Sequence, residues 1–189
     1  MPLLFLWRNT MKIYVARHGQ TQWNAENKVC GRTDLQLTEA GLQQALLLAE
    51  RTKDLALDVI ISSPMQRARQ TAAPAAALHG LEMLVDERLI EQDYGIYEGV
   101  SRFDEGFLSN KRHFAFRYPG GESMMDVAHR VYGFLEEIRE KYPDKAVLLV
   151  CHGGVCRVIR TYFEDMTNEE YFSYSEENAN IILICNKTV

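Results

Sequence analysis

The sequence has few cysteines, no excess of positive charge and no hydrophobic stretch long enough to cross a membrane. Its cysteines are sparse and irregularly spaced for a disulfide scaffold, which favours a reduced, cytoplasmic setting; they are Cys30, Cys151, Cys156 and Cys185. A net charge of -5 argues against nucleic acid as a partner, because such binding needs a basic surface, although it permits a local cationic pocket. The apolar segment 1–7 is too short to span a bilayer and lacks the flanks of a signal peptide.

The length and composition predict a single globular domain. With 189 residues, of which 47% are hydrophobic and 25% charged, the chain is long enough to bury a substantial core. It has no internal repeat, low-complexity tract or interdomain linker. Met11 stands directly before the first predicted strand, so we expect residues 1–10 to be an N-terminal extension and residues 11–189 to form one domain. No heptad pattern specifies an oligomer, and a homo-oligomer is compatible with the sequence.

Short apolar or β-branched runs alternate with amphipathic segments along most of the chain. The runs that predict strands are 11–16, 57–62, 81–85, 146–151 and 181–185. Helices are predicted from residue 39, over 65–78, over 124–141 and over 154–165. Strands that alternate with helices form right-handed βαβ units. We therefore expect an α/β fold, in which a mostly parallel sheet is the middle layer of a three-layer α/β/α sandwich.

Local signals refine three of these helices. Leu42, Ala45, Leu46 and Ala49 share the helical spacing of the apolar face that the first helix is expected to bury. Ser63, which precedes a proline, is the predicted N-cap of the second helix. Ser123 and Asp126 form a capping-box pair before the third helix, with Asp in place of the usual Glu.

Residues 86–120 lack clean periodicity, and we expect loop with some irregular helix there. Within this segment, residues 100–120 mix basic side chains with aromatic ones, and we interpret them as a short cap insert. The mixture is typical of a cap that packs its aromatic rings inward and leaves its charges in water. Because the insert follows the acidic residue Glu91, it can hang over a site near that residue and select what binds there.

Two predicted strands end in residues suited to binding an anion. Arg17 and His18 follow the first strand, and His152 and Gly153 follow the fourth. The carboxyl ends of parallel strands meet at one edge of the sheet, and Arg67, in the first turn of the second helix, can face the same edge. Gly153 permits close backbone approach at a helix N-terminus. The two arginines and two histidines therefore predict a pocket for a dianionic phosphate.

Phosphoryl transfer from an alcohol to an imidazole also needs a proton for the departing oxygen. The same group can then deprotonate the water that attacks phosphohistidine. Glu91 suits both roles, and Asp93 and Glu98 are alternatives that the residues alone leave open.

A metal site is the alternative interpretation of the cysteines near His152. Cys151 and Cys156 flank that histidine, and Cys30 would be a fourth ligand. However, the side chain of Cys151 alternates away from that of His152 at the end of an apolar strand, and no C-x-x-C pair exists. We therefore expect buried core thiols and no metal ligands.

The motifs, in their order along the chain, resemble the histidine phosphatase superfamily, which has the phosphoglycerate mutase-like fold. The resemblance covers about residues 11–184. It depends on RHGQTQWN at 17–24, GRTDLQLT at 31–38, SSPMQRA at 62–68, EQDYGIYEG at 91–99, GES at 121–123 and CHGG at 151–154. Each motif alone is weak, but together they occur in the expected order on the expected elements.

The resemblance implies specific roles. His18 is the nucleophile that becomes phosphorylated, and Glu91 is the general acid and then the general base. Arg17, Arg67 and His152 hold the phosphoryl oxygens and stabilise charge in the transition state. Further positions in or near the pocket are Asn24, the Gly31 backbone and Tyr94. The resemblance implies phosphatase chemistry that needs no metal and no organic cofactor.

Three functions remain open on the sequence. The leading one is a phosphomonoester hydrolase that acts on a small phosphorylated metabolite through phosphohistidine. The second is a cofactor-dependent phosphoglycerate mutase, whose members usually carry Asn where Gly154 stands and a longer insert; the basic pair Lys111 and Arg112 could hold a carboxylate in such an enzyme. The third is a non-catalytic phospho-ligand binding module, against which the intact His18 and Glu91 argue.

Overall fold

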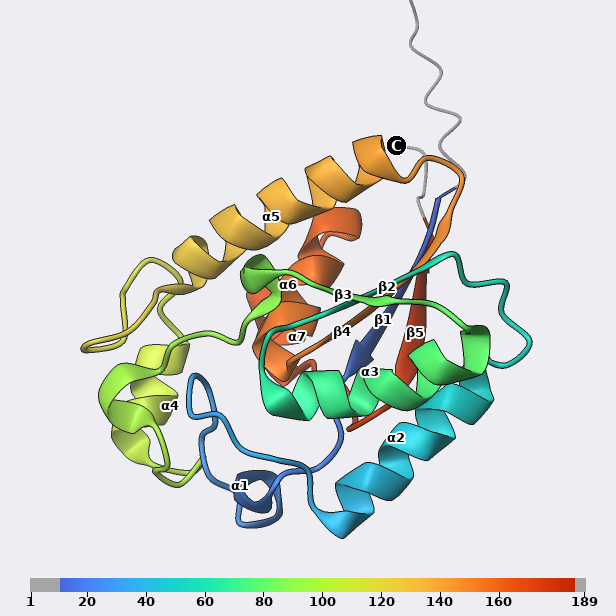
Figure 1. The fold of residues 1–189 in the computed structure, drawn as a ribbon. Helices are drawn as coiled ribbons and strands as arrows, with labels where there is room; N and C mark the ends of the chain where they lie inside the picture. Colours follow the sequence, from blue (N-terminus) through green and yellow to red (C-terminus); the bar gives the residue numbers. More distant parts are fainter. Residues whose placement is uncertain (1–10, 186–189) are drawn as a thin grey trace, which may run out of the picture.

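The computed structural model describes residues 11–185. At its centre lies a five-stranded sheet with the order β3-β2-β4-β1-β5 (Figure 1). The strands are β1 Lys12–Arg17, β2 Val59–Ser62, β3 Met83–Val85, β4 Ala146–Cys151 and β5 Ile181–Cys185. The pairs β1–β4, β2–β4 and β2–β3 are parallel, whereas β5 runs antiparallel to β1. The prediction of a mostly parallel sheet is confirmed.

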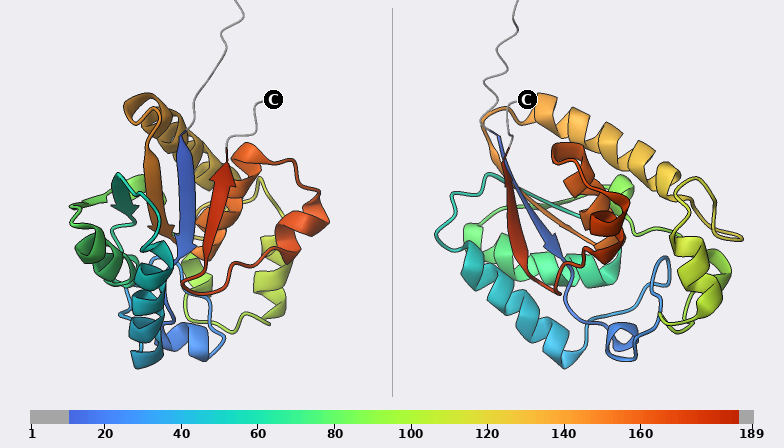
Figure 2. Two further views of the ribbon diagram at one scale, coloured as in Figure 1. Left: turned by 90° about the vertical axis from the view of Figure 1, so that its right-hand side faces the viewer. Right: turned by 180° about the vertical axis from the view of Figure 1, so that it is seen from behind.

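Helices cover both faces of this sheet (Figure 2). They are α2 (Glu39–Thr52) and α3 (Gln66–His79) on one face, and α5 (Met124–Lys141) and α6 (Gly153–Phe163) on the other. Successive residues of β1 point to opposite faces, so Tyr14 joins the alanine-rich core under α2 and α3 while Val15 joins the core under α5 and α6. The result is the predicted α/β/α sandwich.

The loops at the carboxyl edge of the sheet carry short elements. These are α1 (Gln22–Ala25), η1 (Glu87–Leu89), η2 (Gly95–Tyr97), α4 (Glu105–Lys111) and α7 (Asn168–Ser173). The cap insert is more regular than predicted, because Asp104 accepts a hydrogen bond from the Phe107 amide and starts α4. Phe107 stacks on Tyr118 at 5.8 Å, and both pack against Val29 in a small core of their own.

The local helix signals were right in part. Ser123 and Asp126 form the predicted capping box of α5. On the predicted apolar face of α2, Ala45 and Ala49 are buried, whereas Leu42 and Leu46 are exposed, because α2 packs on α3 through such small side chains. Such side chains let α2 and α3 approach closely, which turns the two leucines toward solvent.

Two expectations about the chain ends and membranes can be placed against the structure. Residues 1–10, predicted to be an N-terminal extension, lie outside the described residues, so the single-domain boundary at residue 11 stays a prediction. Within residues 11–185, every helix falls short of the length and apolarity that a membrane crossing requires.

Candidate active site

The parallel pairing of β1 with β4 brings the two predicted histidines together. Arg17 stands opposite Cys151 in the register, and the backbone N–H of His18 donates to the Cys151 carbonyl at 2.9 Å. Both chains then leave the sheet at the same edge. The rings of His18 and His152 meet there edge to face, with centroids 5.1 Å apart. The predicted meeting of the two strand ends is therefore seen in the structure.

The surroundings of His18 favour a neutral, nucleophilic imidazole. Its Nδ1 lies 2.7 Å from the Gly19 carbonyl oxygen, which can only accept, so Nδ1 carries the proton and Nε2 keeps its lone pair. Burial, together with the charges of Arg67 and Arg17, holds the pKa of His18 well below its usual range. The ring is therefore unprotonated at Nε2 near neutral pH.

His152 is fixed at both ring nitrogens. Arg67 Nε donates to its Nδ1 at 3.2 Å, so the proton resides on Nε2, which donates to Ser63 Oγ at 2.7 Å. Burial and the charge of Arg67 hold the pKa of His152 well below its usual range. Ser63 was predicted to be a helix N-cap, but Met65 takes that position, and Ser63 instead orients His152. The only local signal for this role is the position of Ser63 directly after β2.

Arg67 is fully buried and shapes the loop that precedes α2. Its guanidinium donates to the carbonyls of Thr33 at 2.9 Å and Gly31 at 2.7 Å. The N–H of Gly31 donates to Glu98. Both polar groups of the Gly31 backbone therefore hold Arg67 and the loop, and its place in the pocket stays a prediction.

Arg17 presents donors that the protein itself leaves unused. Its Nη1 donates to the Glu176 carbonyl at 2.8 Å, whereas its buried Nε has no partner among residues 11–185. A Cβ on Gly153 would lie 3.6 Å from that Nε, so this glycine keeps the start of α6 close to the guanidinium. A buried, unpaired guanidinium N–H beside a helix N-terminus is suited to an anion.

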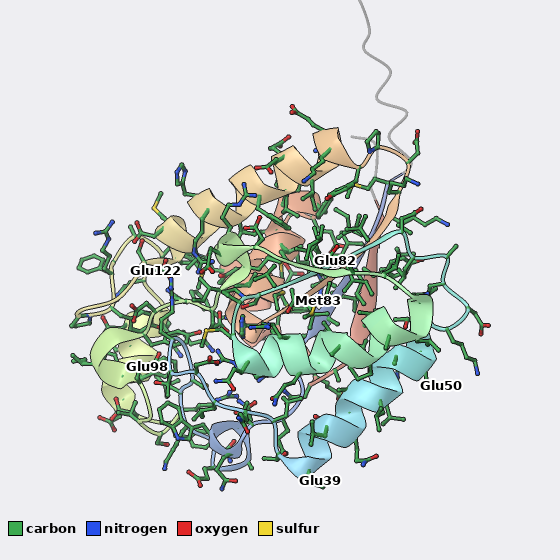
Figure 3. All side chains as sticks on the ribbon, in the orientation of Figure 1. Glu39, Glu50, Glu82, Met83, Glu98 and Glu122 are labelled. Carbon is green, nitrogen blue, oxygen red and sulfur yellow. The ribbon has the colours of Figure 1, made fainter. Side chains whose placement is uncertain are left out.

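Glu91 is a carboxylate that lines the same cavity as His18. It is buried, its Oε2 accepts from the Gly154 amide at 3.0 Å, and its Oε1 accepts from the Gln92 amide at 2.9 Å. The alternatives serve the backbone instead. Glu98, labelled in Figure 3, accepts from the amides of residues 31–33, and Asp93 accepts from the Gly95 amide.

These groups surround a cavity of about 130 Å³. Of the predicted residues, Arg17, His18, Asn24, Glu91, Tyr94 and Gly153 line it. Arg67 and His152 are not among the described residues that line it; the His152 ring contacts that of His18, and Arg67 donates to His152. Burial and the neighbouring Glu91 charge raise the pKa of Tyr94 well above its usual range, so its hydroxyl keeps its proton.

Several lining residues were not named individually as site residues; they include Arg102, Phe107, Arg157, Ser175 and Glu176. Arg102 and Phe107 belong to the cap insert, which was expected to hang over the pocket. Arg157, Ser175 and Glu176 come from segments without a recognisable motif, and only the fold brings them to the cavity. Lys111 also lines the cavity, whereas its neighbour Arg112 is exposed to solvent.

The thiols considered as metal ligands are separated by the fold. Cys151 and Cys156 lie in the core with their sulfurs 3.5 Å apart, and Cys30 lies on the cavity wall. In the part of the chain that the structure describes, no three His, Cys, Asp or Glu side chains gather as a metal site would require.

Comparisons with known proteins agree with this geometry. A sequence model of the histidine phosphatase superfamily (branch 1) matches residues 13–187. Phosphoserine phosphatase 1 of Hydrogenobacter thermophilus is 32% identical over 181 residues, which cover 92% of this chain and 86% of that protein. A protein named probable phosphoglycerate mutase GpmB, of Cronobacter sakazakii, is 39% identical over 151 residues, which cover 76% of this chain and 70% of that protein.

A solved structure is similar over nearly the whole fold. The mycobacterial glucosyl-3-phosphoglycerate phosphatase superposes with a TM-score of 0.82 and 27% identity, covering 91% of this chain and 88% of that one. The sheet order, the paired histidines at its edge and the matched sequence model all lead to one assignment. This chain belongs to the histidine phosphatase superfamily, branch 1.

Proposed function

We propose that this protein is a phosphomonoester hydrolase, of the histidine acid-type, that acts on a small phosphorylated metabolite through a phosphohistidine intermediate. The observation that carries the proposal is His18: a buried, neutral imidazole with a free Nε2, beside the unused donors of Arg17 and opposite Glu91. Relatives named as phosphatases of small phosphorylated acids support it.

In the first step His18 Nε2 attacks phosphorus as the bond from phosphorus to the ester oxygen breaks. Glu91 gives its proton to that oxygen, so the product leaves as a neutral alcohol. Arg17 and Arg67 offset the negative charge on the phosphoryl oxygens. His152, held by Ser63 and Arg67, helps to stabilise the same charge.

In the second step water attacks the phosphohistidine. Glu91 accepts a proton from the water as the new bond from oxygen to phosphorus forms, and the bond from phosphorus to Nε2 breaks. His18 returns to its neutral form and Glu91 to its protonated form. Inorganic phosphate is released, and each residue ends in its starting state.

A mutase is the second candidate, and the relative named phosphoglycerate mutase supports it. In a mutase the phosphoryl group would return from His18 to a sugar acid held in place. Two features of this chain favour transfer to water instead. Gly154 stands where such mutases usually carry Asn, and the cap insert is short.

The nucleophile is tested by measuring phosphate release from p-nitrophenyl phosphate and a panel of phosphorylated metabolites without added metal. We expect turnover by the wild type, loss of turnover in His18→Ala, and unchanged turnover in His129→Ala, which alters an exposed histidine of α5. Wild type quenched in alkaline denaturant, which preserves the acid-labile bond from phosphorus to nitrogen, should also carry a phosphoryl group that His18→Ala lacks. Retained turnover in His18→Ala would exclude this residue as the nucleophile.

The acid and the competing mutase need separate measurements. Glu91→Gln should slow hydrolysis of an alkyl phosphate more than that of p-nitrophenyl phosphate, because the nitrophenolate leaves without a proton. Equal losses on both substrates would count against Glu91 as the acid. Conversion of 3-phosphoglycerate that 2,3-bisphosphoglycerate stimulates, and that exceeds hydrolysis, would establish the mutase instead.

The compartment is also a proposal. Cys151 and Cys156 are free thiols with sulfurs 3.5 Å apart, a separation well beyond a disulfide bond. Free thiols this close together are typical of a reducing compartment, which supports the cytoplasm.

A further inference from the structure

The cavity contains more positive charge than one phosphoryl group engages. Besides Arg17, its wall includes Arg102, Lys111 and Arg157. Within residues 11–185, none of these last three forms an ion pair with a carboxylate. The hydrolysis described above uses none of them.

The second carboxylate on the wall forms no ion pair with these cations in the described part of the chain. Glu176 is buried, its Oε2 accepts from the Tyr174 hydroxyl at 2.5 Å, and its Oε1 accepts from Asn180 at 2.6 Å. Both of its oxygens are therefore directed to neutral donors on its own loop.

Each of the two guanidinium groups donates a hydrogen bond to a backbone carbonyl of the protein. Arg102 Nε donates to the Lys28 carbonyl at 3.1 Å. Arg157 Nη2 donates to the Tyr174 carbonyl at 2.9 Å, and its guanidinium lies 5.3 Å from the ring centre of Tyr171. The buried Nε of Arg157 has no partner in the described part of the chain. Such fixed guanidinium groups are ready to bind a carboxylate or phosphate.

Lys111, in the last turn of α4, lines the same cavity as Arg102 and Arg157, and the three together form a cationic cluster. Burial, and then the charges of Arg157 and Arg102, lower the pKa of Lys111 to about 8. The three cations thus repel one another without an acidic partner. A cluster of this kind costs folding free energy that a bound anion would recover.

The cluster lies close to the phosphoryl site. Gly153 borders the Arg17 guanidinium, and Arg157 follows four residues later on the same helix, about one turn or 5.4 Å along the axis. Lys111 and Arg102 approach from the cap insert. A single small molecule can therefore reach from His18 to this cluster.

We propose that Arg102, Lys111 and Arg157 bind a second anionic group of the substrate, either a carboxylate or another phosphate. The enzyme then prefers phosphomonoesters that carry such a group over those whose remaining part is neutral. The expected preference in kcat/KM rests on the proposed hydrolase function, whereas the expected preference in binding rests on the cavity alone.

Two matched substrate pairs test the preference and identify the anion. They are 3-phosphoglycerate with glycerol 3-phosphate, for a carboxylate, and fructose 1,6-bisphosphate with fructose 6-phosphate, for a phosphate. We expect kcat/KM to be at least about tenfold higher for the charged member of one pair, as a charge-assisted contact would give. Equal values within both pairs would overturn the proposal.

Variants assign the preference to the cluster. Lys111→Met and Arg157→Met should each lower the ratio of kcat/KM within the preferred pair by about tenfold or more. Arg112→Met removes the same charge from the neighbouring exposed position and should leave the ratio unchanged. If Arg112→Met and Lys111→Met lowered this ratio equally, the preference would come from long-range electrostatic attraction and not from a binding site, and the proposal would be overturned.

Calorimetry separates this inference from the hydrolase itself. His18→Ala is mixed with each member of the preferred pair, so binding is measured without turnover. Tighter binding of the charged member supports the second-anion site even if the wild type hydrolyses nothing, which would refute only the hydrolase. Equal binding of both members overturns the inference even if hydrolysis is rapid.

Discussion

Gly154→Ala tests the link between the start of α6 and Glu91, the acid in the mechanism we propose. Gly154 has none of the positive φ that would exclude alanine, so the backbone accepts the change. The added Cβ would lie 2.6 Å from Glu91 Oε1 and 3.4 Å from the Tyr94 hydroxyl. Ordinary contact begins near 3.4 Å, so the carboxylate must withdraw by roughly 0.8 Å from its place in the cavity.

The size of the effect follows from that displacement. A misplacement of about 1 Å can cost about a hundredfold in rate, and positioned acid–base catalysis is worth about a hundredfold or more. We therefore expect kcat for an alkyl phosphate such as glycerol 3-phosphate to fall about ten- to a hundredfold. The loss should be smaller for p-nitrophenyl phosphate, whose leaving group needs no proton.

The free energy of unfolding should rise or stay unchanged, although kcat falls. Alanine is a better helix former than glycine by about 1 kcal/mol, which offsets the cost of moving Glu91. Gly133→Ala is the matched control, because Gly133 lies in α5 and its added Cβ would meet no atom within 4 Å. Both variants are assayed by phosphate release and thermal unfolding. A folded Gly154→Ala protein with wild-type kcat on the alkyl phosphate would refute the role assigned to Glu91.

Three further predictions concern protons and hydrogen bonds in the site. Ser63→Ala removes the acceptor of His152 Nε2–H, so kcat should fall about tenfold while the melting temperature changes little, as phosphate release and calorimetry would show. His18 and His152 are neutral in the folded state because their pKa values are lowered, whereas the unfolded chain takes up protons below its ordinary histidine pKa. The free energy of unfolding by urea should therefore fall between pH 7 and pH 5, by up to about 1.4 kcal/mol per pH unit for each histidine, and a flat profile would contradict this. Since the pKa of Lys111 is lowered to about 8, kcat/KM for a substrate with a second anion should decline as pH rises through that value and Lys111 loses its charge. Lys111→Arg should abolish that decline in the measured pH profile.

The sequence predicts most of the fold and the centre of the site because local rules act there. The apolar run of β4 is buried along its whole length, and the capping box at Ser123 starts α5 where expected. His18 and His152 could be placed together because the carboxyl ends of parallel strands lie at one edge of a sheet. That inference needs only the direction of the strands and no knowledge of side-chain contacts. Glu91 could be preferred over Asp93 and Glu98 only by resemblance, since all three are carboxylates in one loop.

The parts that could not be predicted depend on orientation and long-range contact. Leu42 has the spacing of a buried face, but the close packing of α2 on α3 selected small residues for that face. Gly31 matched a pocket motif, yet its polar groups are consumed by Arg67 and Glu98. Arg157 lies on an amphipathic helix like many solvated arginines, and only the tertiary fold places it on the cavity wall.

Several residues that depart from ordinary folding rules lie at or beside one cavity. Two neutral buried histidines, the buried Glu91, and Arg17 and Arg157 with their unpaired buried Nε atoms each lower stability on their own. Elsewhere, caps, apolar strands and alanine-lined helix contacts follow local preference, so the fold can tolerate this cost at a single edge of the sheet. In the mechanism we propose, His18 and Arg17 meet the phosphoryl group while Arg102 and Lys111 lie toward the cap, so catalysis and substrate choice would depend on different parts of the chain. Changes in the cap can therefore alter which phosphorylated compound is bound without disturbing the phosphoryl chemistry at the strand ends.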